Sequence, residues 1–166
     1  HRHARRERFW SVQRKRREKP VSDSTPPTDY EKIIYFMEEG IPFNRYLGLK
    51  VHHLEHGKCI LRLPWNENFI GDTMRPALHG GVTSTLIDVA GGCACFTMIE
   101  LPQTRLSTVD LRIDYLLPGP AEELFVSAEV IRMGSRVATA TMELRAGSPT
   151  NPQVFAIGRG AYNVKR

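Results

Sequence analysis

The segment His79–Glu100 constrains the fold most, because it is the one long run of the chain with helical periodicity. Apolar residues recur along it at three- and four-residue spacing, which predicts a single buried stripe. The stripe consists of Val82, Leu86, Val89, Cys93 and Phe96. At 22 residues the helix would be about 33 Å long. Its small residues Gly91, Gly92 and Ala94 favour close packing against another element.

Four runs rich in β-branched residues follow this helix and predict long strands. The runs are Thr104–Leu116, Glu122–Met133, Arg136–Arg145 and Gln153–Val164. Because the turns between them are short, we expect these strands to pair antiparallel. Two further strands are expected before the helix, at Gly48–Leu54 and Lys58–Leu63. One long helix packed against a curved antiparallel sheet is an α+β architecture.

The remaining segments before the long helix are shorter and more polar. A short helix is expected over Tyr30–Glu39, where Gly40 stops it and Pro42 prevents its return. The stretch Pro64–Leu78 has no hydrophobic period and predicts a long loop, which in a compact domain often carries function. Since a single helix covers only one face of the sheet, we expect a dimer or a larger assembly.

Charge divides the chain into a basic N-terminal extension, residues 1–28, and one domain, residues 29–166. Residues 1–20 hold nine Lys and Arg against two Glu, a net charge of +7, whereas residues 21–166 hold 14 basic and 16 acidic groups, a net charge of −2. Residues 20–28 are rich in Pro, Ser and Thr and predict a linker. The default interpretation of the basic segment is a solvated extension; a targeting fragment, an anionic-membrane contact and a nucleic-acid contact are the alternatives. For the domain itself we expect no nucleic-acid partner.

Three cysteines at irregular spacing argue against a disulfide framework and favour a reducing, cytoplasmic environment. Cys93 and Cys95 would lie about 200° apart around the helix, so we expect core residues rather than a redox pair. His52 and His53 point to opposite faces of their expected strand, which makes it difficult for them to bind one metal ion together. We therefore expect neither a metal nor a cofactor.

The triplet His79-Gly80-Gly81 stands where the long helix is expected to begin. Backbone N–H groups in the first turn of a helix lack intrahelical acceptors and lie at the positive end of the helix dipole. Without side chains at the two glycines, a ligand carbonyl oxygen that becomes an oxyanion can approach these donors. The alternative is a helix start whose glycines only allow tight packing.

Asp88 lies in the middle of the same helix among apolar neighbours. A carboxylate in such a position is exposed, paired or functional. Ser84 and Thr85 would share its face of the helix, so an exposed or Thr-paired aspartate is one interpretation. The other is a general base or nucleophile in a partly dry site.

The His-Gly-Gly triplet at 79–81, Asp88 and the run Thr108–Pro118, in this order, resemble hotdog-fold acyl-CoA thioesterases of the PaaI type. Within that family the chain resembles the YigI-like medium/long-chain acyl-CoA thioesterases, over roughly residues 30–164. The resemblance implies a hotdog fold, in which a long central helix is wrapped by an antiparallel sheet. It further implies a homodimer or homotetramer with active sites at the subunit interface, and hydrolysis of medium- to long-chain or aryl acyl-CoA without a cofactor.

The resemblance also assigns catalytic roles to residues of this chain. Asp88 matches the acid that activates water or attacks the thioester. Gly80 matches the glycine whose N–H holds the thioester oxygen, with Gly81 beside it and His79 near the same pocket. Thr108 matches a Ser or Thr that positions the water from the partner subunit.

Substrate-binding residues are implied in the same way. Arg136 follows the hairpin glycine Gly134, where related proteins place a basic residue that contacts CoA. Many family members carry a carbonyl-polarising asparagine six residues before the motif histidine, and this chain has Thr73 there. Asn66 and Asn68 lie further upstream as candidates for that role.

Two other functions fit the same fold. A hotdog hydratase or dehydratase would use a catalytic His paired to an acid and a Phe-Pro-Gly sequence, which this chain lacks. A non-catalytic acyl-CoA sensor would bind the thioester without cleaving it.

Overall fold

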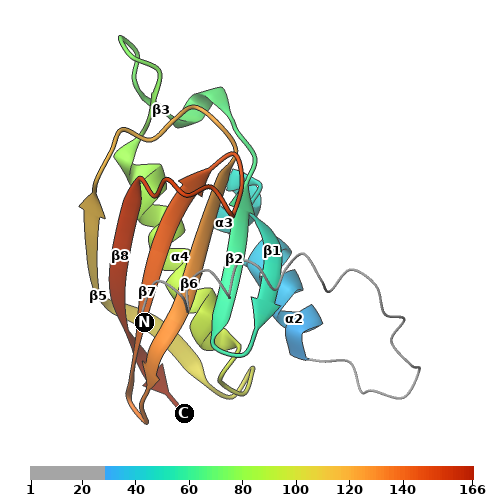
Figure 1. Ribbon diagram of the computed structural model, residues 1–166. Helices are drawn as coiled ribbons and strands as arrows, with labels where there is room; N and C mark the ends of the chain where they lie inside the picture. The colour runs from blue at the N-terminus through green and yellow to red at the C-terminus, as the bar shows by residue number, and fades with distance from the viewer. Residues whose placement is uncertain (1–28) are drawn as a thin grey trace.

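The computed structural model describes residues 29–166, so the predicted basic extension and linker, residues 1–28, lie outside the described residues. Figure 1 shows one helix enclosed by one large curved sheet. No helix among residues 29–166 is both long enough and apolar enough to span a bilayer.

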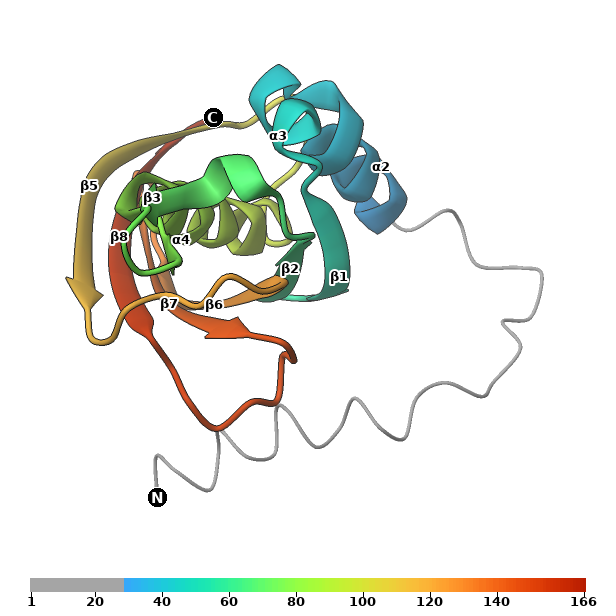
Figure 2. The same ribbon diagram turned by 90° about the horizontal axis from the view of Figure 1, so that it is seen from above.

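The sheet has six strands in the order β1-β2-β6-β7-β8-β5, and every neighbouring pair is antiparallel. The strands are β1 (Lys50–Glu55), β2 (Lys58–Leu63), β6 (Leu124–Met133), β7 (Val137–Ala146), β8 (Ala156–Lys165) and β5 (Arg105–Tyr115). Figure 2 shows the sheet curling around α4 (Gly80–Phe96), which lies along its concave face. The predicted α+β hotdog architecture is confirmed, and all six predicted strands are present within a few residues of their expected bounds.

The buried face of α4 is broader than the predicted stripe. The buried residues of α4 are Thr83, Leu86, Ile87, Ala90, Gly91, Cys93, Ala94 and Cys95. Val82, Val89 and Phe96 of the expected stripe are only partly buried. The sheet wraps around the helix instead of touching one side, so spacing of apolar residues alone places the buried face wrongly.

Gly91 is the point of closest approach between α4 and the sheet. A Cβ atom at Gly91 would collide with the hydroxyl of Tyr162 on β8. That hydroxyl donates a 2.9 Å hydrogen bond to the backbone carbonyl of Asp88. A Cβ at Gly92 would meet only ordinary contacts, so of the two glycines only Gly91 is required by packing.

Two segments differ from the sequence predictions. Among residues 29–166 the first helix is α2 (Asp29–Tyr35), which continues as the π-helical turn η2 (Phe36–Gly40). The chain then resumes as α3 (Pro42–Leu47), so the expectation that Pro42 prevents a further helix is wrong. Proline is tolerated in the first turn of a helix, where its missing N–H has no acceptor anyway.

The predicted loop before α4 is partly ordered. It contains the short helix η3 (Glu67–Phe69) and a two-stranded hairpin of β3 (Ile70–Asp72) and β4 (Ala77–Leu78). The hairpin projects beyond the sheet at the top of Figure 1. His79 N–H donates to the Phe69 carbonyl at 2.7 Å, which ties η3 to the start of α4.

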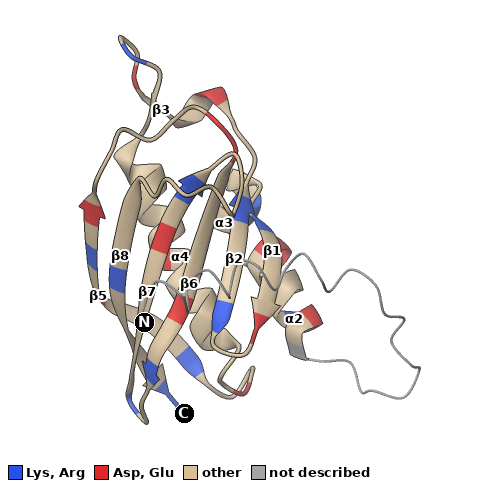
Figure 3. Cartoon of the chain, viewed as in Figure 1, with Lys and Arg blue, Asp and Glu red and all other residues tan. Residues whose placement is uncertain are grey.

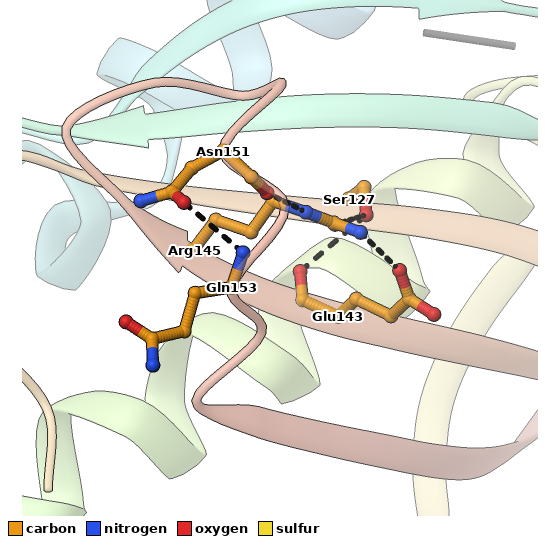
Figure 4. Close-up of polar contacts among 5 residues, drawn as sticks. All are labelled: Ser127, Glu143, Arg145, Asn151 and Gln153. Carbon is orange, nitrogen blue, oxygen red and sulfur yellow. Dashed lines mark hydrogen bonds and ion pairs between the residues drawn. The ribbon is translucent and has the colours of Figure 1, made fainter. Parts of the chain in front are cut away.

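A polar cluster on the outer face of the sheet fixes the β7–β8 loop (Figure 4). Arg145 forms a 2.7 Å ion pair with Glu143, and its Nε donates to the Asn151 carbonyl at 2.9 Å. The Asn151 amide donates to the Ala146 carbonyl at 2.8 Å. These contacts fix the loop that leads to Phe155, which lies near Leu78 and Gly80 at the start of α4.

Candidate active site

The first turn of α4 leaves one backbone donor free. His79 caps the helix, and its Nδ1 accepts the Gly81 N–H at 2.8 Å. Val82 N–H donates to the His79 carbonyl at 3.0 Å. Gly80 N–H has no acceptor in the described part of the chain. The expectation of a second free donor at Gly81 is therefore wrong, because His79 uses it as a cap.

A cavity of about 370 Å³ adjoins Gly80. Its lining is mostly apolar, from Leu78, Phe155 and residues 115–119. Thr83 and Tyr115 are the polar residues of this lining, and the Tyr115 hydroxyl donates to the Gly80 carbonyl at 3.2 Å. We call Gly80 and this adjoining cavity the donor half-site.

Tyr115 was not identified from the sequence, although it lies in the strand that carries Thr108. The two residues are seven apart, so an unbroken strand would place them on opposite faces. A bulge between Thr108 and Asp110 shifts the register against β8, and both side chains face α4. No sequence signal marks that bulge.

Asp88 is paired with Thr108 of its own chain. The Thr108 hydroxyl donates to Asp88 Oδ1 at 2.7 Å. The expectation was that Thr108 positions the water from a partner subunit, whereas here its hydroxyl is bonded to Asp88 of the same chain. Ser84 and Thr85 donate to the Gly81 carbonyl at 3.1 and 2.8 Å and not to Asp88. We call Asp88 and Thr108 the base half-site; Asp88 Oδ1 accepts the Thr108 hydroxyl, and within residues 29–166 the other carboxylate oxygen has no hydrogen bond or ion pair.

The two half-sites of one chain are far apart. Eight residues of α-helix separate Gly80 from Asp88, which is a rise of about 12 Å. Reacting atoms must approach to roughly 3–3.5 Å. A single carbonyl carbon therefore cannot contact both groups of one chain.

The residues proposed to replace the family asparagine lie away from the cavity. Thr73 is exposed in the turn of the β3–β4 hairpin. In that turn the N–H groups of Met74 and Arg75 donate to Asp72 and lower the pKa of its carboxyl group. Asn66 Oδ1 accepts the Asn68 N–H at 2.9 Å and so caps η3. The described structure brings neither Thr73 nor Asn66 to the cavity lining.

Gly134 and Arg136 lie in the β6–β7 hairpin, at the opposite end of the sheet from the start of α4 (Figure 1). Gly134 N–H donates to the Val137 carbonyl at 3.0 Å and closes the hairpin. A Cβ at Gly134 would lie 2.7 Å from that carbonyl oxygen, so the turn requires glycine. Arg136 is exposed.

The three cysteines Cys59, Cys93 and Cys95 are free and buried, which confirms the prediction that Cys93 and Cys95 are core residues. Burial raises the pKa of the Cys95 thiol to about 12 and that of Cys59 well above its ordinary value. Protonated thiols in the core are unsuited to nucleophilic attack. Among residues 29–166 no group of three or more His, Cys, Asp and Glu is placed to hold a metal ion.

Comparison with known proteins shows the same fold and the thioesterase family. Residues 76–152 match the family model described as the thioesterase superfamily. The medium/long-chain acyl-CoA thioesterase YigI of Salmonella typhimurium is 35% identical over 128 residues, which cover 69% of this chain and 79% of that protein. YigI of Escherichia coli is 34% identical over 126 residues, with the same coverage. A crystal structure from Shewanella oneidensis, related to the thioesterase superfamily, has a TM-score of 0.69 and 28% identity, covering 82% of this chain and 95% of that one.

Proposed function

The chain belongs to the thioesterase superfamily and is a thioester hydrolase, and we propose that it cleaves medium- to long-chain acyl-CoA by water attack at a site completed by a second copy of the chain. The observation that carries the proposal is the pair of half-sites. Gly80 N–H is free at the positive end of α4, and Asp88 is held by Thr108 at 2.7 Å. YigI relatives, named as medium/long-chain acyl-CoA thioesterases, support the substrate class.

In this mechanism the thioester oxygen accepts the Gly80 N–H of one copy, where the helix dipole also favours negative charge. Asp88 of the other copy takes a proton from water with its free carboxylate oxygen. Thr108 holds the carboxylate and orients the water. The water oxygen attacks the carbonyl carbon, and the tetrahedral oxyanion collapses with loss of the CoA thiolate. In the second version of this chemistry, an Asp88 carboxylate oxygen attacks the carbonyl carbon, the C–S bond breaks and the CoA thiolate leaves, and water then hydrolyses the resulting anhydride to the free acid and Asp88.

Strand β5 offers the surface on which a second copy would pair. It is an edge strand of 11 residues, and its far edge carries no partner strand among the described residues. Val109 on this strand is 61% exposed. Leu116 and Leu117, which follow the strand, are also exposed. A long unpaired edge with apolar side chains favours association, and we propose a homodimer, or a homotetramer built from such dimers.

The first test measures thiol release from acyl-CoA substrates of two to eighteen carbons and from an aryl thioester. We expect turnover by the wild-type protein, with a preference for medium and long chains. Asp88→Asn should lose roughly 10²–10⁴-fold in kcat, because it removes the general base. Thr108→Ala should lose less, since the carboxylate remains.

Asp110→Asn is the matched control for charge and strand position. Asp110 is exposed on β5, two residues beyond Thr108, and lies on the outer face of the sheet. It should retain wild-type activity. A folded Asp88→Asn protein with wild-type kcat would show that Asp88 is not the general base. If the wild-type protein bound acyl-CoA without turnover, the proposed thioesterase activity would be wrong and the acyl-CoA sensor would be the supported function.

A further inference from the structure

Thr83 carries a buried hydroxyl that the proposed mechanism does not use. The residue is 3% exposed, lies near the start of α4 and lines the cavity of the donor half-site. Its neighbours on the helix, Ser84 and Thr85, each donate to the Gly81 carbonyl. The Thr83 hydroxyl itself forms no hydrogen bond within residues 29–166. A buried hydroxyl without a partner is costly unless water or a ligand completes it.

The other buried Ser and Thr residues differ from Thr83. The hydroxyl groups of Thr97 and Ser127 both form hydrogen bonds. Thr104 is 6% exposed and its hydroxyl has no partner in the described chain, but the residue lies outside the cavity lining. Among the Ser and Thr residues of the described chain, only Thr83 is buried, unpaired and part of this lining.

Thr83 lies beside the proposed position of the substrate carbonyl. It follows Gly80 by three residues, so the two share a face of α4 and are separated by a rise of about 4.5 Å. Side chains of a helix lean toward its N-terminus, which brings the Thr83 side chain back toward the Gly80 N–H. A thioester oxygen bound to that N–H would therefore place the first carbons of an acyl chain next to Thr83.

The rest of the lining suits a hydrocarbon chain with a neutral substituent. Leu78 and Phe155 are buried, and Leu116 and Leu117 form its exposed part. The Tyr115 hydroxyl is already bonded to the backbone of α4. The described lining residues include no Lys, Arg, Asp or Glu, and Figure 3 shows none on the first turns of α4. Because an ion buried here would lack a counter-charge, the lining favours a neutral polar group over an ionic one.

We propose that the Thr83 hydroxyl recognises an oxygen on the third carbon of the acyl chain, so that 3-hydroxyacyl thioesters are the preferred substrates; this inference rests on the proposed function. The third carbon lies only two C–C bonds from the carbonyl carbon, so its oxygen meets Thr83 while the carbonyl oxygen stays at the Gly80 N–H. A hydroxyl substituent donates and accepts, as the Thr83 hydroxyl does. An unsubstituted chain would displace water from Thr83 without replacing its hydrogen bond, and an unpaired polar group in a site discriminates against such a ligand.

The test compares kcat/KM for decanoyl-CoA and for the separate enantiomers of 3-hydroxydecanoyl-CoA. We expect the wild-type protein to prefer one enantiomer over decanoyl-CoA by roughly tenfold, the order of one hydrogen bond, because Thr83 lies on one side of the chain. Thr83→Val removes the hydroxyl at nearly the same shape and should abolish this preference. It should also raise kcat/KM for decanoyl-CoA, which then meets no unpaired hydroxyl. Thr83→Ser keeps a hydroxyl and should keep the preference.

Thr104→Val is the matched control, because it removes a buried hydroxyl that has no partner in the described chain and lies outside the cavity lining. All kcat/KM values should stay at the wild-type level in this variant. Equal kcat/KM of the wild-type protein for the three thioesters would overturn the proposal. An equal loss for all three in Thr83→Val would also overturn it, because the hydroxyl would then contact a part that the substrates share.

A binding measurement separates this proposal from the proposed function. Calorimetric titration with 3-hydroxydecanoate and with decanoate needs no turnover. If no thioester is cleaved, tighter binding of 3-hydroxydecanoate by the wild-type protein than by Thr83→Val, with no such difference for decanoate, still supports the proposal. In that case equal binding of 3-hydroxydecanoate by both proteins, or binding by neither, overturns it. Thermal unfolding checks the fold, and Thr83→Val should be at least as stable as the wild type because it loses an unpaired buried hydroxyl.

Discussion

At the scale of single residues, Gly80 offers an unusually clean test, because its contribution is a backbone N–H. His79 has φ −64° and ψ 129°, which is the conformation that a residue before proline prefers. Proline is also favoured at the first position of a helix. Gly80→Pro should therefore fold while removing the donor. We expect a loss of about 10²–10³-fold in kcat, the usual cost of one oxyanion donor.

Gly80→Ala is the control for that substitution. It keeps the N–H, and its Cβ would lie 3.4 Å from Tyr115 Cε1, an ordinary contact. We expect kcat within a few-fold of the wild type, measured together with thermal unfolding of both variants. A well-folded Gly80→Pro protein with wild-type kcat would show that another group stabilises the oxyanion.

The positions that could be predicted best from the sequence are those that depend on one local element, such as Gly80 at the start of α4. The backbone N–H of Gly80 is free because Gly80 begins a helix, and the His-Gly-Gly triplet predicts that position. Gly81 and Thr108 make contacts with the side chains of His79 and Asp88 that the sequence did not predict. The orientation of the Tyr115 side chain toward α4 depends on a strand bulge. Contacts between elements and local register are not encoded in residue spacing.

At the scale of elements, the buried Cys95 thiol on α4 should make the protein less stable at alkaline pH. The pKa of the Cys95 thiol is raised to about 12 by burial and by Cys93 nearby. Above the ordinary thiol value of about 8.5, the unfolded chain loses this proton while the folded chain keeps it. The free energy of unfolding should therefore fall as pH rises from about 9, by at most about 1.4 kcal/mol per pH unit for this thiol.

Denaturant unfolding between pH 7 and 10 measures this dependence. Cys95→Ala should unfold more easily at pH 7, because it leaves a cavity, but with a shallower fall in stability at alkaline pH. In the folded wild-type protein a thiol reagent should label none of the three buried cysteines. An identical pH dependence in Cys95→Ala and the wild type would assign it to other groups.

The elements themselves were predictable to different degrees. Strand β2 has its expected bounds, because its apolar residues are bounded by Gly57 and Pro64. The start of α4 was predictable for a similar reason, whereas its end at Phe96 was not. There the Thr97 hydroxyl donates to the Ala94 carbonyl and accepts the Gly57 N–H. That termination depends on a residue 40 positions away, which periodicity does not detect.

At the scale of the whole molecule, the separation of the half-sites decides how catalysis is organised. With about 12 Å of helix between Gly80 and Asp88, the proposed function requires that a working site take one group from each of two copies. In a twofold dimer the same pairing occurs twice, because each copy contributes its donor to one site and its base to the other. Such a dimer has two equivalent sites, each of which crosses the interface.

Mixing two inactive variants tests this arrangement. In a heterodimer of Gly80→Pro with Asp88→Asn, one site holds both substitutions and the other holds neither. Equal mixing with random reassociation makes about half of the dimers mixed. About a quarter of wild-type activity should therefore return, since one site in each mixed dimer is intact. If both groups of a site came from one chain, no mixed dimer would hold an intact site, and activity would stay at the level of the separate variants. Exchange after mild denaturation, followed by thiol-release kinetics, distinguishes the two results.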